Sequence, residues 1–568
     1  MISLLITLFI YNAPIYEIEF SGNESISGKT LSKQLISKKG DEFNEVGLVF
    51  DIDKLESYYK TQGFFNTSIR PQVESAEKGI NINFFVEEGQ RPKIEKIVLN
   101  GIEPDEIRKL EFLYEIEIHD FFIKTKLMHT EKAIEVHYMD RGYPYAKVKS
   151  FLMPDSGVVE LTVDKGGFYY IRNIEVEGLK KCNPKIVRRE VDFKKGDIFN
   201  RSKLIKSQRR IYSVGFFGTV NAELVKQEPD SIDLIFTVRE LKARILNFGI
   251  GISIPLSFLI SIGIEELNLF NQGHRYQFKP SFKTNIKREW EFKLEGRYTI
   301  PYVTPLKLTV SDLPFFWFEE KEDFTRQTRG NEFRLSKLIS DNIQFSIANQ
   351  YKFVLLGPKT YVALPDSLRD ITNSIRFQVM IDFRDEFFNP RKGFYAVPLI
   401  EYAGGVFGGV NDFWRLEIEN RLFLRLFKNT LAQRLKTGFV IPRNGVSVHQ
   451  KYYLGGQYSL RGYPERSIGP DTLADEKYGN VLLNYNIEYR VGLPWNFGIV
   501  GFFDIGYINN EFDIQNSDYL KAGAGFGLRY YTPIGPVRGD IGFPLMDKGE
   551  GENSNRSPEL YLGIYHIF

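Results

Sequence analysis

The clearest structural signal in the sequence is Glu289-Trp290-Glu291-Phe292-Lys293-Leu294-Glu295-Gly296-Arg297-Tyr298. Every even position except Gly296 is apolar, and every odd position is charged. Successive side chains of a β-strand point to opposite faces. The segment therefore predicts a strand with one apolar face and one ionic face.

The same alternation recurs in 375–384, 414–426 and 481–491. Strands of soluble proteins average about 5–6 residues, whereas these segments run to about 10, the length of a tilted membrane strand. A closed sheet leaves no unpaired backbone edge in lipid, and its ionic face lines a wet lumen. We therefore predict an antiparallel membrane barrel over 241–568. A large soluble β-sandwich is the alternative.

The stretch 245–264 carries no charge over twenty residues, which is the nominal length of a membrane helix. It contains Gly249, Gly251 and Pro255 and is rich in Ile. Pro and Gly near the middle suit a turn better than the interior of a helix. We predict a strand, a tight turn and a second strand.

A glycine-rich segment follows the predicted strand at 414–426 and includes Leu454-Gly455-Gly456-Gln457-Tyr458-Ser459-Leu460-Arg461-Gly462-Tyr463-Pro464. Such a loop, flanked by strands, is able to fold back into the barrel and bring its arginine to a carboxylate on a strand. The alternating strand 499–507 supplies one, because its outward residues leave Asp504 facing the lumen. Gly501 and Gly506 are expected to allow another segment to pack closely against this strand. The alternatives are a solvated turn arginine and an ordinary lumen carboxylate.

The first 240 residues repeat one unit three times. A helical segment ends in a glycine-aromatic phrase at 59–65, again at 138–144 and again at 212–217. An alternating strand and a glycine precede each phrase, and two extended segments follow it. The predicted order is strand, helix, helix, strand, strand, with the helices covering one face of each sheet.

This unit resembles the POTRA modules of outer-membrane assembly proteins. Leu460-Arg461-Gly462-Tyr463 and Gly501-Phe502-Phe503-Asp504-Ile505-Gly506 resemble the arginine-glycine-aromatic and glycine-aromatic-x-aspartate-x-glycine motifs of the BamA/TamA-type barrel family. The resemblance implies that Arg461 and Asp504 meet inside the barrel, where an arginine–carboxylate pair fixes orientation as well as adding energy. The last residues, ending in Phe568, look like the terminal targeting strand of such barrels, although His566 departs from the usual outward hydrophobic pattern.

The resemblance implies three small α+β modules followed by an all-β antiparallel transmembrane barrel of sixteen strands. The expected division is a signal-like segment, three POTRA-like modules and the barrel, over residues 1–14, 15–90, 91–166, 167–240 and 241–568. The signal-like segment has the length of a signal-peptide core but lacks a basic start and a good cleavage site. A wrongly assigned start or a buried segment is the alternative. The expected location is the outer membrane, with the modules in the periplasm.

The implied function is assembly: the modules receive unfolded barrel proteins, and the barrel helps to insert them, opening between its first and last strands. The implied partners are unfolded outer-membrane proteins, outer-membrane lipid and periplasmic accessory proteins. The alternatives are a TamA-like specialist, a two-partner secretion pore that exports one polypeptide, and a passive porin. Repeated modules argue against a porin, and three of them argue against a secretion pore.

Composition excludes several other classes. The chain of 568 residues has 74 Lys and Arg against 72 Asp and Glu, so charge gives no reason to expect nucleic-acid binding. A single cysteine, Cys182, excludes an internal disulfide and a cysteine-cluster metal site. Six histidines without close pairing make a zinc site unexpected. With no catalytic constellation in the sequence, we predict a non-enzymatic protein without a cofactor.

Overall fold

The computed structural model describes residues 13–227, 229–253, 256–303, 306–322, 324–358, 369–473, 476–513, 519–533, 535–546, 557–564, 566 and 568. Almost all of the predicted signal-like segment lies outside these residues. The chain divides into two compact units, one holding 1–179, 187–213 and 219–239 and the other holding 180–186, 214–218 and 240–568. Among the described residues, no helix is both long and apolar enough to cross a membrane.

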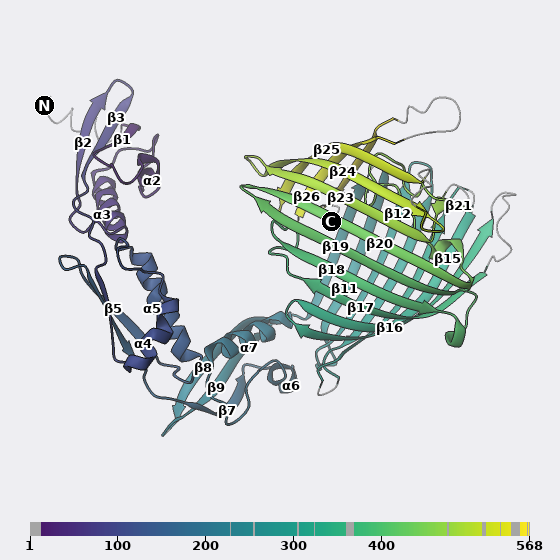
Figure 1. Ribbon diagram of the computed structural model, residues 1–568, viewed down its shortest axis with the longest axis horizontal. Helices are drawn as coiled ribbons and strands as arrows, with labels where there is room; N and C mark the ends of the chain where they lie inside the picture. Colours follow the sequence, from purple (N-terminus) through teal and green to yellow (C-terminus); the bar gives the residue numbers. More distant parts are fainter. Residues whose placement is uncertain are drawn as a thin grey trace. The chain divides into compact units, whose positions relative to one another are not determined.

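The described residues between 13 and 240 form three α+β modules, and each has the predicted order of strand, helix, helix, strand, strand (Figure 1). The first module contains β1 (Ile15–Ser21), α2 (Gly28–Ser32), α3 (Glu45–Thr61), β2 (Ser68–Ala76) and β3 (Gly79–Glu87). The second contains β4 (Lys96–Asn100), α4 (Pro104–Leu110), the short η1 (Glu111–Leu113), α5 (Lys124–Met139), β5 (Lys147–Met153) and β6 (Val158–Asp164). The third contains β7 (Tyr170–Glu177), α6 (Pro184–Arg188), α7 (Arg201–Ser213), β8 (Phe217–Gln227) and β9 (Ser231–Glu240).

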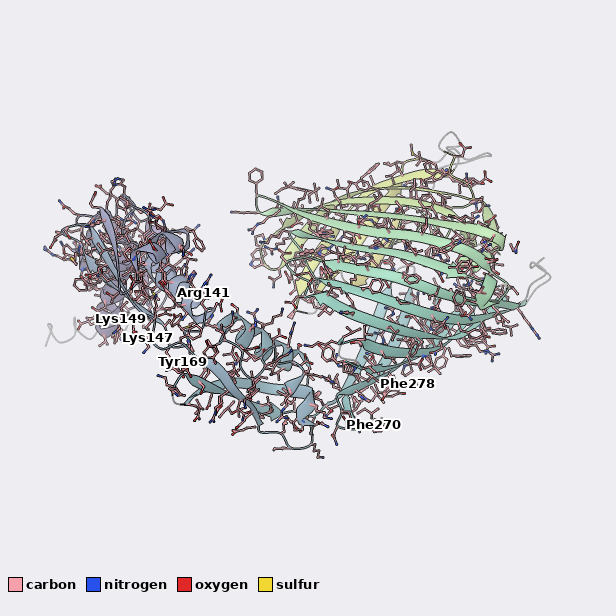
Figure 2. All side chains as sticks on the ribbon, turned by 60° about the horizontal axis from the view of Figure 1, so that its bottom comes forward. Arg141, Lys147, Lys149, Tyr169, Phe270 and Phe278 are labelled. Atoms are coloured by element: carbon pink, nitrogen blue, oxygen red, sulfur yellow. The ribbon has the colours of Figure 1, made fainter. Side chains whose placement is uncertain are left out.

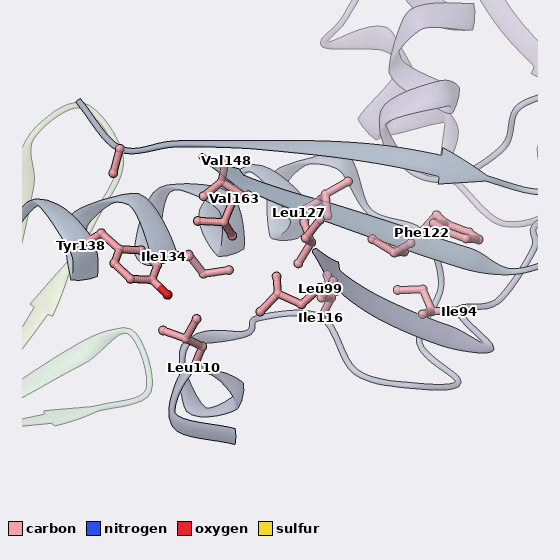
Figure 3. Packing of buried hydrophobic residues seen from close by; sticks show 13 residues of the cluster. Ile94, Leu99, Leu110, Ile116, Phe122, Leu127, Ile134, Tyr138, Val148 and Val163 are labelled. Carbon is pink, nitrogen blue, oxygen red and sulfur yellow. The ribbon is translucent and has the colours of Figure 1, made fainter. Parts of the chain in front are cut away.

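Each module has a three-stranded sheet in which the last strand lies in the middle, giving the orders β1-β3-β2, β4-β6-β5 and β7-β9-β8. The longer helix covers one face, as the second module shows: Ile134 and Tyr138 of α5 belong to the same buried apolar cluster as Val163 of β6 (Figure 3). The repeated phrase ends each long helix with a glycine of positive φ, namely Gly63 (95°), Gly142 (102°) and Gly215 (95°). Glycine adopts this left-handed backbone without the steric cost of a side chain.

The described residues beyond 240 form a sixteen-stranded antiparallel sheet, as predicted, in which each strand pairs with the next sheet strand along the chain and β20 pairs with β23. Its strands are β10 (Arg244–Ser253), β11 (Ser257–Leu269), β12 (His274–Asn285), β13 (Trp290–Ile300), β14 (Thr309–Glu320), β15 (Phe324–Ser340), β16 (Ile343–Pro358), β17 (Arg369–Asp382), β18 (Gly393–Ala403), β19 (Asp412–Leu426), β20 (Asn429–Gly445), β23 (Val481–Gly492), β24 (Phe497–Asn509), β25 (Leu520–Thr532), β26 (Gly535–Pro544) and β27 (Glu559–Ile564). Two short strands, β21 (Asp471–Leu473) and β22 (Glu476–Tyr478), form a hairpin outside this sheet.

The uncharged stretch 245–264 forms two paired strands, β10 and β11, which confirms the prediction of strands instead of a helix. Pro255 itself lies outside the described residues. The predicted alternation of faces also holds: on β24, Ile499 and Phe503 are exposed whereas Val500 and Asp504 are buried. Aromatic residues also reach the solvent in turns, as Phe270 does between β11 and β12 (Figure 2).

The first and last strands of the sheet meet without strand pairing. β10 pairs only with β11, and the six-residue β27 pairs only with β26, within the described part of the chain. Of the predicted terminal strand 560–568, the described residues up to Ile564 belong to β27, and His566 and Phe568 lie outside it. Phe568 is buried against Phe423 and Ala432 on the inner wall, and its carbonyl oxygen accepts a hydrogen bond of 3.2 Å from Arg490. Its role as a targeting signal stays a prediction.

Candidate functional site

The segment between β20 and β23, described over residues 446–473 and 476–480, packs inside the barrel. Its apolar residues Leu454, Leu460, Tyr463 and Ile468 are buried. They contact inward-facing residues of the barrel wall: Ala403, Phe413, Val440, Leu482 and Ile508. This inner loop fills space that an open pore would leave to water, and Arg461 is fully buried within it.

Arg461 of the inner loop is fully buried and binds Asp504 of β24 in a bidentate pair. Its Nε donates to Oδ2 at 2.7 Å, and its Nη2 donates to Oδ1 at 2.9 Å. The backbone amide of Arg461 donates to the same carboxylate at 3.1 Å. The structure thus brings together the two residues that the family resemblance paired. Three hydrogen bonds fix both the side chain and the backbone of the loop at this point.

Two further acidic residues surround the guanidinium of Arg461. Its Nη1 donates to Glu488 of β23 at 2.8 Å and lies 3.6 Å from Asp540 of β26. The ring of Phe502 stacks beneath it, with the ring centre 3.4 Å from Cζ. All three carboxylates are buried. Buried carboxylates require opposite charges nearby, so Arg461 stabilises a cluster that joins three strands.

Glycines let the inner loop lie flat against β25 and β26. A Cβ atom on Gly523 would overlap the carbonyl oxygen of Arg461, and one on Gly542 would lie 2.6 Å from the amide nitrogen of Gly462. Gly462 itself has φ of 96°, and its own Cβ would lie 2.8 Å from the backbone of Phe543. The motif therefore needs glycine on both sides of the contact.

The last strand of the barrel also holds the motif. The amide of Gly462 donates to the hydroxyl of Tyr561 on β27 at 3.0 Å, and this hydroxyl donates to the carbonyl oxygen of Tyr463 at 3.1 Å. The hydroxyl of Tyr463 donates in turn to backbone carbonyls at Ala522 (3.2 Å) or Met546 (3.1 Å). A strand at the unpaired seam is thus bonded directly to the inner loop.

The two glycines predicted to make room on β24 behave differently. Gly506 does so, because its Cβ would lie 2.8 Å from Leu454 of the inner loop. The expectation was wrong for Gly501, where a Cβ would meet nothing within 4 Å. Gly501 is exposed and lies on the outward face of β24 with Ile499 and Phe503. The inner loop packs against the opposite face, so the missing side chain at Gly501 makes no room for it.

The far end of the inner loop is bonded to the opposite wall. Glu476 of β22 accepts hydrogen bonds from Arg326 of β15 at 2.9 Å and from Arg466 at 3.0 Å. Nearer its start, His449 is paired with Asp370 of β17. The loop is therefore fixed at both ends as well as at Arg461.

The sequence did not single out Glu488, Asp540, Tyr561 or Arg326. A usable signal existed for Glu488, since it occupies an inward position of the alternating stretch 481–491. Asp540, Tyr561 and Arg326 contact the inner loop, and these contacts could be predicted only if the path of the loop through the barrel were known.

Comparisons with known proteins agree with this architecture. A model of the Omp85 superfamily domain matches residues 268–564, and a model of the surface antigen variable number repeat, POTRA, matches 13–89 and 169–241. Outer membrane protein assembly factor BamA of Nitratidesulfovibrio vulgaris is 26% identical over 91% of this chain and 67% of its own. The protein of the same name from Neorickettsia risticii is 24% identical over 95% of this chain and 76% of its own.

A solved structure shows the same fold. The crystal structure of BamA from Haemophilus ducreyi lacking POTRA domains 1–3 aligns with a TM-score of 0.65 at 21% identity, covering 83% of this chain and 98% of that one. Together, the matches assign the barrel to the outer membrane and the modules to the periplasm. The chain belongs to the Omp85 superfamily, as a member of its BamA/TamA-type family.

Proposed function

We propose that this protein is an outer-membrane assembly factor, which receives unfolded barrel proteins through its three modules and helps to insert them into the outer membrane. One observation carries the proposal: three sheet-bearing modules are followed in one chain by a sixteen-stranded sheet whose first and last strands, as far as they are described, do not pair with each other. Relatives that match 91% and 95% of the chain are named outer membrane protein assembly factors.

The seam between β10 and β27 gives insertion a physical route. An unpaired strand edge presents rows of backbone donors and acceptors to which another strand can add. Gly249 and Gly251 leave β10 with fewer side chains to pack across the seam. A client strand that pairs with β10 would have its backbone groups satisfied before it meets lipid, where unpaired groups cost several kcal/mol each.

The buried cluster around Arg461 supports the same function as a structural brace. It ties the inner loop to β23, β24 and β26, while Tyr561 ties it to β27. We propose that Arg461, Gly462, Tyr463, Asp504 and Gly506 keep this wall in one register while the seam opens. We further propose that the protein is not an enzyme, that it contacts outer-membrane lipid and periplasmic accessory proteins, and that its domains divide at residues 90, 166 and 240.

Depletion of the protein in its own cell tests the function. The expected result is a general loss of outer-membrane barrels, measured by quantitative proteomics of the membrane fraction. Loss of a few clients would indicate the TamA-like specialist role. Failure to export a single polypeptide, with other barrels unchanged, would contradict assembly and favour a two-partner secretion pore.

Tyr561→Phe is expected to loosen the inner loop without disturbing the packing of the ring. The change removes the hydroxyl that accepts from Gly462 and donates to Tyr463, and a buried amide left unpaired costs about 1–3 kcal/mol. We expect a lower thermal unfolding midpoint of the barrel in detergent and slower client insertion. The matched control is Tyr485→Phe, which removes a hydroxyl bonded to Gln433 away from the loop. Equal midpoint shifts in both variants would contradict a specific role for Tyr561.

A further inference from the structure

The three modules differ at the sheet edge to which an extended polypeptide could add. In each module the first strand forms one edge, and a loop amide–carbonyl bond of 2.8 Å lies at or just before its start: Ile15 N to Asp41 O, Ile94 N to Asp120 O and Ile171 N to Asp197 O. The opposite edges are β2, β5 and β8. Whether these edges have free backbone groups decides where a strand can bind.

The β5 edge of the second module is covered by side chains of its own helix. Glu135 of α5 accepts from the amide of Val148 at 3.2 Å, and Glu131 accepts from the amide of Ser150 at 2.8 Å. These two amides belong to residues whose side chains face the helix, and they point away from β6. An incoming strand would have to displace both carboxylates before it could bond to β5.

The β2 edge of the first module is interrupted by Pro71. The edge strands of the two modules can be aligned through the buried residues of their central strands. In the second module, Val163 pairs with Val148 and Leu161 pairs with Ser150. In the first module, Val86 pairs with Ile69 and Phe84 pairs with Pro71. Pro71 therefore stands where the capped amide of Ser150 stands. Proline has no amide hydrogen, so this position offers no donor to an added strand.

The β8 edge of the third module has neither obstacle. It is the longest of the three edge strands, at 11 residues against 9 and 7, and it contains no proline. Within the described residues, no side chain accepts from an amide of Thr219–Gln227. The helix residue Gln208 instead donates to the carbonyl oxygen of Val220, at 3.4 Å. The amides of this edge are available to a partner.

The helix beside β8 also favours one kind of partner. α7 contains five basic residues and no acidic residue, whereas α5 carries both signs. At helical spacing, Arg201, Ile205 and Tyr212 lie on the same side of α7 as Gln208. Side chains of an added strand that face the helix would meet two apolar residues and one guanidinium, which suits a strand carrying apolar residues and a carboxylate.

We propose that β8 is the edge at which this protein binds its clients, as extended segments with apolar and acidic side chains, and that β2 and β5 are shielded against such binding. This assignment rests on the proposed assembly function and narrows it to one module. The shielding has a benefit: three equivalent edges would hold one unfolded chain in several registers, whereas one edge delivers it from one place.

Photocrosslinking in the full-length protein tests the assignment. A photoreactive amino acid is placed at Arg70 on β2, Lys149 on β5 (labelled in Figure 2) or Asn221 on β8, which are all exposed positions. The probe is a urea-unfolded porin with a fluorescent label, diluted onto the protein in detergent. We expect crosslinking at Asn221 to exceed that at the other two positions by about tenfold, which corresponds to roughly one net hydrogen bond.

Two variants make the result decisive. Ala222 is two residues from Val220, so its backbone amide points to the same free edge of β8. Ala222→Pro removes this amide hydrogen and is expected to reduce crosslinking at Asn221 to the level seen on β2. The double change Glu131→Ala with Glu135→Ala is expected to raise crosslinking at Lys149, a gain that misfolding would not produce. Equal crosslinking at all three edges of the unmodified protein, or no gain at Lys149 in the double variant, would overturn the proposal. Insertion of the porin into lipid vesicles is measured separately. Insertion without crosslinking at Asn221 would refute client binding at β8 and leave the assembly function standing. Crosslinking at Asn221 without insertion would refute the assembly function.

Discussion

Arg461→Ala is expected to abolish client insertion and to lower the yield of folded barrel severely. The change leaves Asp504 fully buried without its bidentate partner, whereas Glu488 loses one cation and keeps Arg490 at 2.8 Å. Removing one partner of a buried ion pair costs about 3–5 kcal/mol, because the remaining charge, here that of Asp504, stays buried without its guanidinium partner. The measurements are the heat-modifiable migration of the folded barrel on gels and insertion of an unfolded porin into lipid vesicles containing the purified variant.

Arg461→Lys separates charge from geometry. Lysine restores a positive charge, but a single ammonium group does not reproduce the two parallel bonds to Asp504 or the stacking on Phe502. We therefore expect a partial recovery of folding and a smaller recovery of insertion. Arg425→Ala, at an exposed arginine of β19, is the control and should behave as the unmodified protein. Normal assembly and activity in Arg461→Ala would refute the role assigned to the cluster.

Gly523→Val is expected to have an effect almost as large, by a steric route. Its Cβ would overlap the carbonyl oxygen of Arg461, and neither backbone has a flexible end that could move aside. Overpacking of a tight contact costs about 1–3 kcal/mol and occasionally more, and here relief requires the loop to leave the wall. We expect the inner loop to become sensitive to protease in the purified barrel, together with a loss of insertion.

Gly501→Val is the matched control for that change. It adds the same side chain on the neighbouring strand, where a Cβ meets nothing within 4 Å and the neighbouring outward residues are apolar. We expect wild-type folding and insertion. If the Gly501 variant lost as much activity as the Gly523 variant, strand propensity alone would explain both results, and close packing of the loop would not.

Alternation was enough to predict the barrel, because a two-residue period determines which side chains face the lumen. The same rule placed Asp504 inward before any contact was known. The rule did not lead to the correct role for Gly501, because a glycine has no side chain whose polarity indicates which face of the strand it occupies. Position in the alternation would have marked it as outward, and hence as unable to admit the inner loop.

Partners across the lumen were beyond the reach of the sequence. Asp540 and Tyr561 lie 79 and 100 positions after Arg461, and only the folded path of the loop brings them beside it. Tyrosine also suits both a lipid-facing and a lumen-facing position, so its identity does not reveal its side. The shielded edges of the modules were hidden for a similar reason: Glu131 and Glu135 look like ordinary surface residues of a helix until their bonds to β5 are known.

The glycines beneath the inner loop have a consequence for how the protein can change over generations. Gly523 and Gly542 are each one nucleotide substitution away from several larger residues, and every such residue would intrude on the loop backbone. Positions on the outward face of the same strands require only an apolar side chain, and several amino acids meet that requirement. After random mutagenesis and selection for viability, we therefore expect substitutions along β25 and β26 to alternate with a period of two residues. Outward positions should accept many residues, and inward positions should accept few.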